Sequence, residues 1–466
     1  MIDRNYLICG GCRELILARI DIGPTRLTKF AFACPVCEYI IRGNYSGDSP
    51  EKHSINFQGA TRTSPEESGG SSRGAAFGIA PSLTNNQPPT VTLGLHVPLD
   101  PRAKDLSEPY SGPNITFGML FDDKAEWAAG VNATLRQMGP TWERYQQLLH
   151  FYLEGDWKRF SRVGRDLFRT AWKEPSNQQE RHILAIQPAF LFLLPVLPGN
   201  YGHRLLEEHA QAVLRVQACT PLATWVHVVE EDGSLATLQR DLLDCLRSYI
   251  DQWETWAPGL IYAIGPSGGR GLESLVLARD DFVTLRDTFV HTYETCCQAL
   301  PYAIALMNAA NRGDPNAFPD VPEDIRQDNS KARPPLSIEA FRGVPNANKM
   351  KWFFEWEQWT SVLPTILDKD LRNAIGHATA KHNISTGNVE SDKFIMPYGM
   401  LASKVLLLGH VLLIMLQVVK TLRLMAADWS AQSVEEDAST AVGDDQGLEP
   451  PTGGQVSKGV GPRRDA

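Results

Sequence analysis

The spacing of hydrophobic residues changes along the chain. Within residues 1–46, the stretches RELILARID and TRLTKFAFAC are rich in β-branched and aromatic residues and are separated by Gly23 and Pro24. This pattern is typical of two strands joined by a turn. From about Phe117 onward, apolar residues recur every three or four positions, as in WERYQQLLHFYLEGDW, which predicts helices. We therefore expect a mainly α-helical chain that begins with a small β hairpin.

Two segments show neither periodicity. Residues 47–116 are rich in Gly, Ser, Pro, Thr and Asn, and they offer too few apolar side chains to offset the entropy of ordering. They are expected to form a flexible linker that holds one or two short strands, such as TVTLGLHV. Residues 428–466 are acidic and rich in glycine, which predicts a disordered tail.

The helical part is interrupted by clusters of Gly and Pro, and no internal repeat is present. We expect a helical bundle with two parts, of which only the second carries a motif with chemical meaning. The predicted division is a ribbon at 1–46, a linker at 47–116, a helical domain of open role at 117–232, a second helical domain at 233–427 and a tail at 428–466.

Four of the eight cysteines form two pairs near the start of the chain, Cys9-x2-Cys12 and Cys34-x2-Cys37. Two such pairs at the ends of a hairpin bring four thiolates together in the tetrahedral arrangement that zinc prefers. Because four protein ligands leave no position for water, we expect structural zinc, as in a zinc ribbon. A redox dithiol would need a thioredoxin-like context, which the sequence lacks. Whether the ribbon contacts nucleic acid or a protein partner stays open.

Composition limits the classes of function. The formal net charge is -9, the opposite of a protein that coats nucleic acid non-specifically, so any contact with nucleic acid must be local. The start of the chain lacks the apolar core of a signal peptide, and we expect a cytoplasmic protein. The longest uncharged apolar run, Val405 to Val419, is shorter than the ~18 residues of a membrane span. It predicts a buried core helix, with no membrane partner.

One short segment, DLRNAIGHA at residues 370–378, separates its side chains into two faces of a helix. Leucine, alanine and isoleucine form an apolar stripe, whereas Arg372, Asn373 and His377 lie on the other side, with Gly376 leaving a notch between the arginine and the histidine. A guanidinium binds phosphate and an imidazole moves protons near neutral pH. The segment therefore has the parts of a metal-independent ribonuclease site.

LRNAIGHA resembles the Rx4-6H signature of the HEPN superfamily, in which a polar residue, often asparagine, follows the arginine. The resemblance covers at most about Leu235 to Leu424. It implies a helical bundle, two copies that meet at a homodimer interface, and RNA cleavage by the neighbouring 2′-hydroxyl without a catalytic cofactor. It further implies that Arg372 stabilises the phosphate, His377 is the general acid or base, and Asn373 orients the phosphate or its partners. A toxin or defence role would follow.

Spacing alone does not establish this reading, because two other pairs share it, Arg204/His209 and Arg286/His291. The first lacks a polar residue after its arginine and is interpreted as an ordinary helix face. The second places Val290 at the notch and is a weaker second candidate. The rival hypothesis is a non-catalytic RNA- or protein-binding module with a structural zinc ribbon. Burial of both polar side chains in a monomer core would favour that rival.

Overall fold

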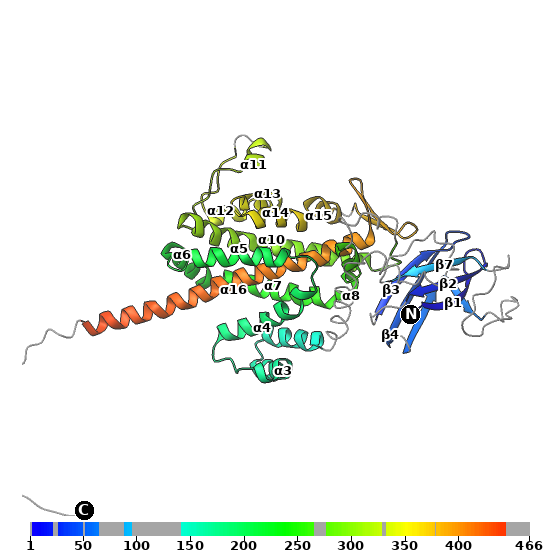
Figure 1. Cartoon of the computed structure of the whole chain (residues 1–466), viewed down its shortest axis with the longest axis horizontal. Coiled ribbons are helices and arrows are strands. Elements are labelled where there is room, and N and C mark those ends of the chain that lie inside the picture. Colours follow the sequence, from blue (N-terminus) through cyan, green and yellow to red (C-terminus); the bar gives the residue numbers. More distant parts are fainter. Residues whose placement is uncertain are drawn as a thin grey trace, which may run out of the picture.

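The structure is a computed structural model, and it describes residues 2–21, 27–49, 52–64, 88–95, 141–264, 276–328, 332–377 and 379–443. A small β unit lies at one end of a larger helical domain (Figure 1). The predicted fold class, mainly helical with a small N-terminal β region, is confirmed.

The β unit contains two sheets. Its strands are β1 (Ile2–Cys9), β2 (Leu15–Asp21), β3 (Leu27–Ala33), β4 (Ile40–Ser49), β5 (Lys52–Gln58), β6 (Ala60–Thr63) and β7 (Thr90–Gly94). One sheet has the strand order β6-β1-β2-β7 and the other β3-β4-β5. Alternate side chains of both sheets, among them Leu7, Ile16, Phe30 and Ile41, are buried in one shared core, as the period of a half-buried strand requires.

The predicted hairpin between the two apolar stretches is wrong, since β2 and β3 belong to different sheets. Instead, each cysteine pair closes a hairpin of its own. The β1–β2 ladder ends at the pair Ile8↔Leu15, and the β3–β4 ladder ends with Ala33 opposite Ile40. Local composition identified the strands, whereas their pairing depends on which apolar faces meet in the core. Gly23 and Pro24 lie outside the described residues.

The β unit also extends further than residue 46. Strands β5, β6 and β7 all lie inside the range predicted to be linker. Strand β5, KHSINFQ, buries only Ile55, so its mostly polar composition concealed a strand at the edge of a sheet. Strand β7 corresponds to the short strand expected in TVTLGLHV. The unit therefore reaches at least Leu95, and residues 65–87 and 96–116 lie outside the described part of the chain.

Helices make up most of the rest of the described chain. After a helical segment at 141–153 come α3 (Trp157–Phe168), η1 (Arg169–Ala171), α4 (Gln178–Phe192), η2 (Leu194–Val196), α5 (Tyr201–Arg215), α6 (Thr220–Glu231), α7 (Ser234–Asp251), α8 (Trp253–Trp256), α9 (Gly259–Ile264), α10 (Phe282–Arg312), α11 (Glu323–Asp328), α12 (Ile338–Arg342), α13 (Asn346–Lys349), η4 (Met350–Phe353), α14 (Glu357–Ile366), α15 (Lys369–Gly376) and α16 (Tyr398–Gly443). Three short strands precede α16, namely β8 (Lys381–Asn383), β9 (Asn388–Glu390) and β10 (Ile395–Pro397).

Helices α10 and α16 form the centre of the helical domain (Figure 1). The run from Val405 to Val419 is buried almost throughout, which confirms the prediction of a core helix. By length and composition alone, Tyr398–Ala427 is apolar enough to cross a membrane, but 83% of its most apolar window is buried inside the protein. The helix is apolar all round because other helices surround it.

A single hydrophobic core runs from Trp142 to Ala426. Helices α4, α5 and α6 pack on α16, so the predicted boundary at residues 232/233 does not coincide with a break in this core. Helix α16 continues to Gly443, which corrects the predicted start of the disordered tail at 428. Residues 410–442 contain no Gly or Pro, so the sequence has no helix stop signal before Gly443. Residues 444–466 lie outside the described chain.

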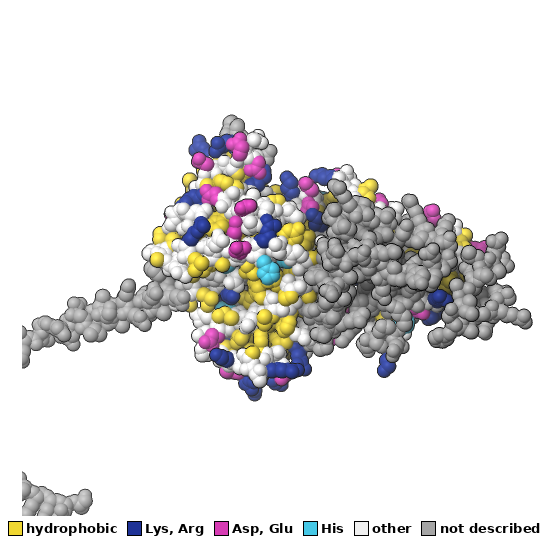
Figure 2. Space-filling view, in the orientation of Figure 1, with side chains coloured by type: hydrophobic (Ala, Val, Ile, Leu, Met, Phe, Trp, Pro, Cys, Tyr) yellow, Lys and Arg dark blue, Asp and Glu magenta, His cyan; other side chains and the backbone are white. Residues whose placement is uncertain are grey.

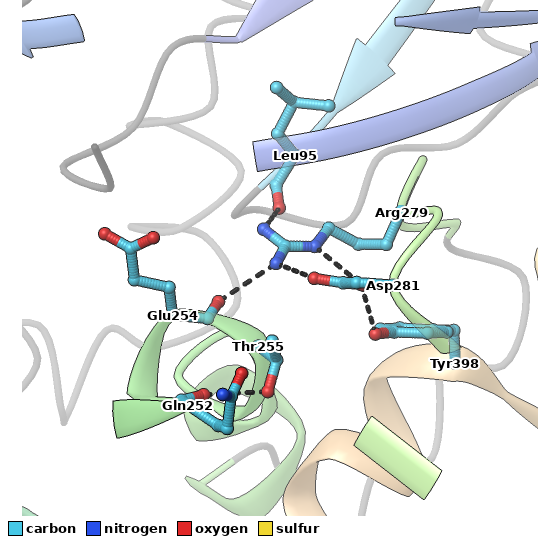
Figure 3. A network of polar contacts seen from close by, with 7 residues as sticks. All are labelled: Leu95, Gln252, Glu254, Thr255, Arg279, Asp281 and Tyr398. Carbon is cyan, nitrogen blue, oxygen red and sulfur yellow. Dashed lines mark hydrogen bonds and ion pairs between the residues drawn. The ribbon is translucent and has the colours of Figure 1, made fainter. Parts of the chain in front are cut away.

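A buried arginine joins the β unit to the helical domain (Figure 3). Arg279 is 1% exposed, and its guanidinium forms an ion pair with Asp281 and donates hydrogen bonds to the carbonyl oxygens of Leu95 (3.5 Å) and Glu254 (3.0 Å). Asp281 also accepts a hydrogen bond from the Tyr398 hydroxyl at 2.5 Å. Burial acts to lower the pKa of Arg279, but Asp281 more than offsets this effect and holds it above its usual value.

Backbone contacts reinforce this junction. The Ala278 amide donates to the Gly94 carbonyl at 2.9 Å, and the Asp280 amide donates to the Lys29 carbonyl at 3.0 Å. The Asp280 carboxylate pairs with Arg42 of β4. The segment before α10 is thus attached to both sheets of the β unit.

Candidate functional site

The four N-terminal cysteines lie together at one end of the β unit. Cys9 ends β1 and Cys12 lies in the turn after it, whereas Cys34 and Cys37 occupy the turn between β3 and β4. Their Sγ atoms all lie within 4.8 Å of one another. The Sγ atoms of Cys9 and Cys37 are 3.8 Å apart, and those of Cys12 and Cys34 are 3.9 Å apart.

These distances fit a tetrahedral metal site. With Zn–S bonds of ~2.3 Å, the sulfurs of a tetrahedron lie about 3.8 Å apart. The Gly11 amide donates to the Cys9 sulfur at 3.4 Å, a contact that stabilises a thiolate. Burial raises the pKa of the Cys34 thiol, and the neighbouring thiols of Cys9 and Cys37 raise it further. The cluster could hold a metal ion such as zinc, which would replace thiol protons with one cation.

The two turns that present the cysteines share a backbone geometry. The residue after the second cysteine adopts a positive φ in each, Arg13 at 65° and Glu38 at 61°, a conformation that tightens a turn. A Cβ atom on Gly11 would lie 2.9 Å from Cβ of Tyr39 and 3.3 Å from Sγ of Cys37. A glycine is therefore needed for the two turns to approach each other.

The motif segment forms the short helix α15. The side chain of Asp368 caps its N-terminus by accepting from the Leu371 amide at 3.0 Å. Leu371, Ala374 and Ile375 are buried, as the apolar stripe predicted, whereas Ala378 lies outside the described residues. The helix ends at Gly376, and the backbone of His377 caps it by donating to the Asn373 carbonyl at 2.9 Å.

Arg372 lies across the helix end. Its Nη1 donates to Oδ1 of Asn373 at 3.4 Å, and a Cβ on Gly376 would lie 3.6 Å from that same nitrogen. The predicted notch is therefore beside the guanidinium. The side chain of Arg372 is 34% exposed and forms an ion pair with Glu294 of α10. Gly376 and His377 are exposed, so the motif residues reach the surface.

Helices α10 and α13 contribute further polar residues beside the motif, and no sequence pattern indicated them. The Glu294 carboxylate also accepts from the Asn346 amide group at 3.0 Å, and Oδ1 of Asn346 accepts from the buried Lys349 ammonium at 3.0 Å. Burial lowers the pKa of Lys349. His291 is exposed one helical turn before Glu294. No sequence signal linked Glu294 to Arg372, because 78 positions separate them.

The rejected pair Arg204/His209 does not form a site. Arg204 contacts Gln358 and Ser361 of α14, whereas His209 is buried and lies 3.1 Å from the Thr421 hydroxyl. Burial lowers the pKa of His209 to about 4. This imidazole is a core residue.

Comparisons with known proteins add no relative. No family model matches the chain, no curated protein matches it, and no solved structure matches it.

Proposed function

We propose that the chain is a metal-independent endoribonuclease of the HEPN type, with Arg372, Asn373 and His377 as its catalytic residues. The observation that carries this proposal is the placement of the motif at an exposed helix end, where Gly376 lies beside the guanidinium. The motif is not sealed in the monomer core, and a phosphodiester can therefore approach it. A cytoplasmic protein of a toxin or defence system is the setting that the proposal implies.

The proposed reaction needs one base and one acid. The base removes the proton of the 2′-hydroxyl, the 2′-oxygen attacks the adjacent phosphorus, and the bond from phosphorus to the 5′-oxygen breaks. The acid protonates that leaving oxygen, so the products are a 2′,3′-cyclic phosphate and a 5′-hydroxyl. Arg372 stabilises the charge that develops on the phosphate, and His377 transfers a proton. Asn373 orients the guanidinium.

A homodimer would complete this site. One histidine cannot act as acid and base in the same step, and α15 presents one histidine at its end. The motif of a second copy would supply the other proton-transfer group. Because His377 is exposed, the faces of two copies can meet around an RNA strand.

We further propose that the cysteine cluster binds zinc and that the ion is structural. Four sulfur ligands leave no position for substrate, so the ion supports the two turns. The second turn exposes Val36 (47%) and Tyr39 (46%). These side chains favour a protein partner for this zinc ribbon, since apolar and aromatic groups are common in protein interfaces.

One observation favours the rival function, a non-catalytic RNA- or protein-binding module. Arg372 is already paired with Glu294, and a phosphate must displace or share this partner. If the pair persists, Arg372 holds α15 on α10 and takes no part in chemistry.

The test is cleavage of end-labelled RNA by the full chain and by Arg372→Ala and His377→Ala. Arg247→Ala and His227→Ala are matched controls, because Arg247 is also ion-paired with 32% exposure and His227 is 39% exposed. We expect the motif variants to lose roughly 10²-fold or more of the rate and the controls to keep it. Equal activity in all variants of equal circular dichroism would favour the binding module.

A further inference from the structure

We propose that the exposed basic face of α3 and the turn after it is the surface on which this protein docks the phosphate backbone of RNA. The inference rests on the proposed function, because it names where the substrate is held. It also gives a role to part of residues 117–232, which carry no recognisable motif.

The first observation is a local excess of charge. Residues 157–173 contain six basic residues and one acidic residue, Asp166, hence a net charge of +5 in a chain whose net charge is -9. All six basic side chains are exposed: Lys158, Arg159, Arg162, Arg165, Arg169 and Lys173. In Figure 2, lysine and arginine gather along the lower edge of the helical domain, where Figure 1 places α3.

The second observation is that much of this charge is uncompensated. Arg159 pairs with Asp156, and Arg165 pairs with Glu174. Within the described residues, the other four cations of the face form no ion pair. Exposed cations without a counter-charge repel one another and are available to a polyanion. A groove of about 510 Å³ is lined by four of the cations and by the N-cap residue, namely Lys158, Arg159, Arg162, Arg165 and Asp156.

The third observation concerns how the turn is held. Trp172 folds back onto α3, so that a Cβ on Gly164 would lie 2.1 Å from its ring, and its indole N–H donates to Glu174 at 2.9 Å. This packing keeps Arg169 and Lys173 beside the helix. Arg169 itself adopts a φ of 50° at the C-terminal end of α3, a backbone conformation that residues other than glycine seldom adopt. The backbone conformation of this arginine is therefore energetically unfavourable.

These features favour RNA over an anionic membrane. A helix that lies in a membrane surface exposes apolar and aromatic side chains beside its basic ones. Here Phe160 and Val163 are buried in the core, and Trp172 stacks on Phe168. Arginine outnumbers lysine on the face, and the planar guanidinium matches phosphate with two hydrogen bonds. The face is therefore suited to bind successive phosphate groups of an RNA strand.

The basic face is remote from the motif. Helices α3 and α15 lie on opposite sides of the helical domain (Figure 1). A substrate held on α3 must extend past the bundle or enter the motif of a second copy. Long RNA should therefore depend on the basic face, whereas a dinucleotide should not.

The test is binding of a labelled single-stranded RNA by fluorescence anisotropy, with the full chain carrying His377→Ala so that binding is measured without cleavage. The test variant is Arg162→Glu with Arg169→Glu, since neither arginine forms an ion pair with any residue that the structure describes. The control is Arg326→Glu with Arg333→Glu, which changes the net charge equally; both residues are exposed, and α11, which contains Arg326, lies on the opposite edge (Figure 1).

We expect the test variant to weaken binding about tenfold for unrelated RNA sequences and to reduce the slope of log K against log salt by about 1.4. The control should bind as the parent does. If the test variant and the control bind RNA equally well, the proposal is overturned. It is also overturned if the test variant keeps its affinity for RNA but loses binding to phosphatidylserine vesicles. The two proposals can fail separately. If the unsubstituted chain cleaves no RNA but the test variant still loses RNA binding, the docking surface is established and only the nuclease proposal is refuted.

Discussion

Replacing Asp281 with asparagine tests how the β unit and the helical domain are held together. Asp281 is 9% exposed and pairs with Arg279, which is 1% exposed. Asparagine keeps the shape of the side chain but removes its charge. The guanidinium would stay buried, with the carbonyl oxygens of Leu95 and Glu254 as its remaining acceptors besides the new amide.

Removing one partner of a buried ion pair costs about 3–5 kcal/mol, because an uncompensated charge stays out of water. We therefore expect Asp281→Asn to lower the free energy of unfolding by that amount. Tyr398→Phe, which removes the hydroxyl that donates to Asp281, should cost less, about 1.5–3 kcal/mol. As a control, Asp244→Asn breaks a pair whose carboxylate is 48% exposed and should cost at most about 1 kcal/mol.

The assay is unfolding in urea with two probes. All tryptophans that the structure describes lie in the helical domain, and the β unit contains none among its described residues, so tryptophan fluorescence reports mainly the helical domain. Release of the zinc ion that we propose for the cysteine cluster reports the β unit. In Asp281→Asn we expect both midpoints to fall and the zinc midpoint to fall further, since the junction is weakened. A loss below about 1 kcal/mol, the range of exposed pairs, would refute the view that this pair is desolvated.

Three further predictions concern the two sites. Cys12→Ser should leave fewer than one zinc per chain, measured by metal analysis after dialysis, because one of four ligands is lost; a full equivalent would exclude the tetrahedral site. Glu294→Gln should slow RNA cleavage roughly tenfold, since Arg372 loses the partner that orients it, and an increase in rate would show instead that Glu294 competes with the phosphate. His291→Ala should leave both the rate and the stability measured in urea unchanged, because His291 is exposed and the second proton-transfer group is assigned to the motif of a second copy; a lower rate would show instead that His291 takes part in proton transfer.

Local patterns in the sequence predicted the parts of this molecule that depend on near neighbours. The spacing of Cys9, Cys12, Cys34 and Cys37 predicted a four-sulfur cluster, and the structure brings their Sγ atoms within 4.8 Å. Each Cys-x2-Cys pair depends only on one tight turn, which neighbouring residues determine. The tryptophans at 352, 356 and 359 recur at helical spacing, a pattern typical of core positions, and they are at most 5% exposed.

Features that depend on distant neighbours were missed. Strands β2 and β3 were expected to pair with each other. Instead, β2 pairs with β1 and β3 pairs with β4, in each case across a turn that contains a cysteine pair. Their own residues could not specify this choice, since both strands bury an apolar face. The burial of Arg279 was not predicted either. Its ion-pair partner Asp281 is only two positions away, but the carbonyl groups of Leu95 and Glu254, which enclose the guanidinium, lie 184 and 25 positions away. His382, five positions after His377, lies outside the motif helix, in β8 against Tyr398.

The candidate active site was predicted only in part. The helix wheel of residues 370–378 correctly separated the buried stripe from the polar face. It could not supply Glu294 or Asn346, which reach the site from other helices. The length of the helix also differs, as α15 ends at Gly376 and His377 therefore lies at its end.

The most direct test of the nuclease proposal uses an RNA that carries a single 2′-deoxynucleotide at the position where the unmodified RNA is cut, incubated without added divalent cations. The proposed attack needs the 2′-oxygen of that nucleotide. We predict that the modified position resists cleavage and that the unmodified RNA yields a 2′,3′-cyclic phosphate and a 5′-hydroxyl. Cleavage at the deoxynucleotide, or products ending in a 3′-hydroxyl and a 5′-phosphate, would contradict the mechanism assigned to Arg372 and His377.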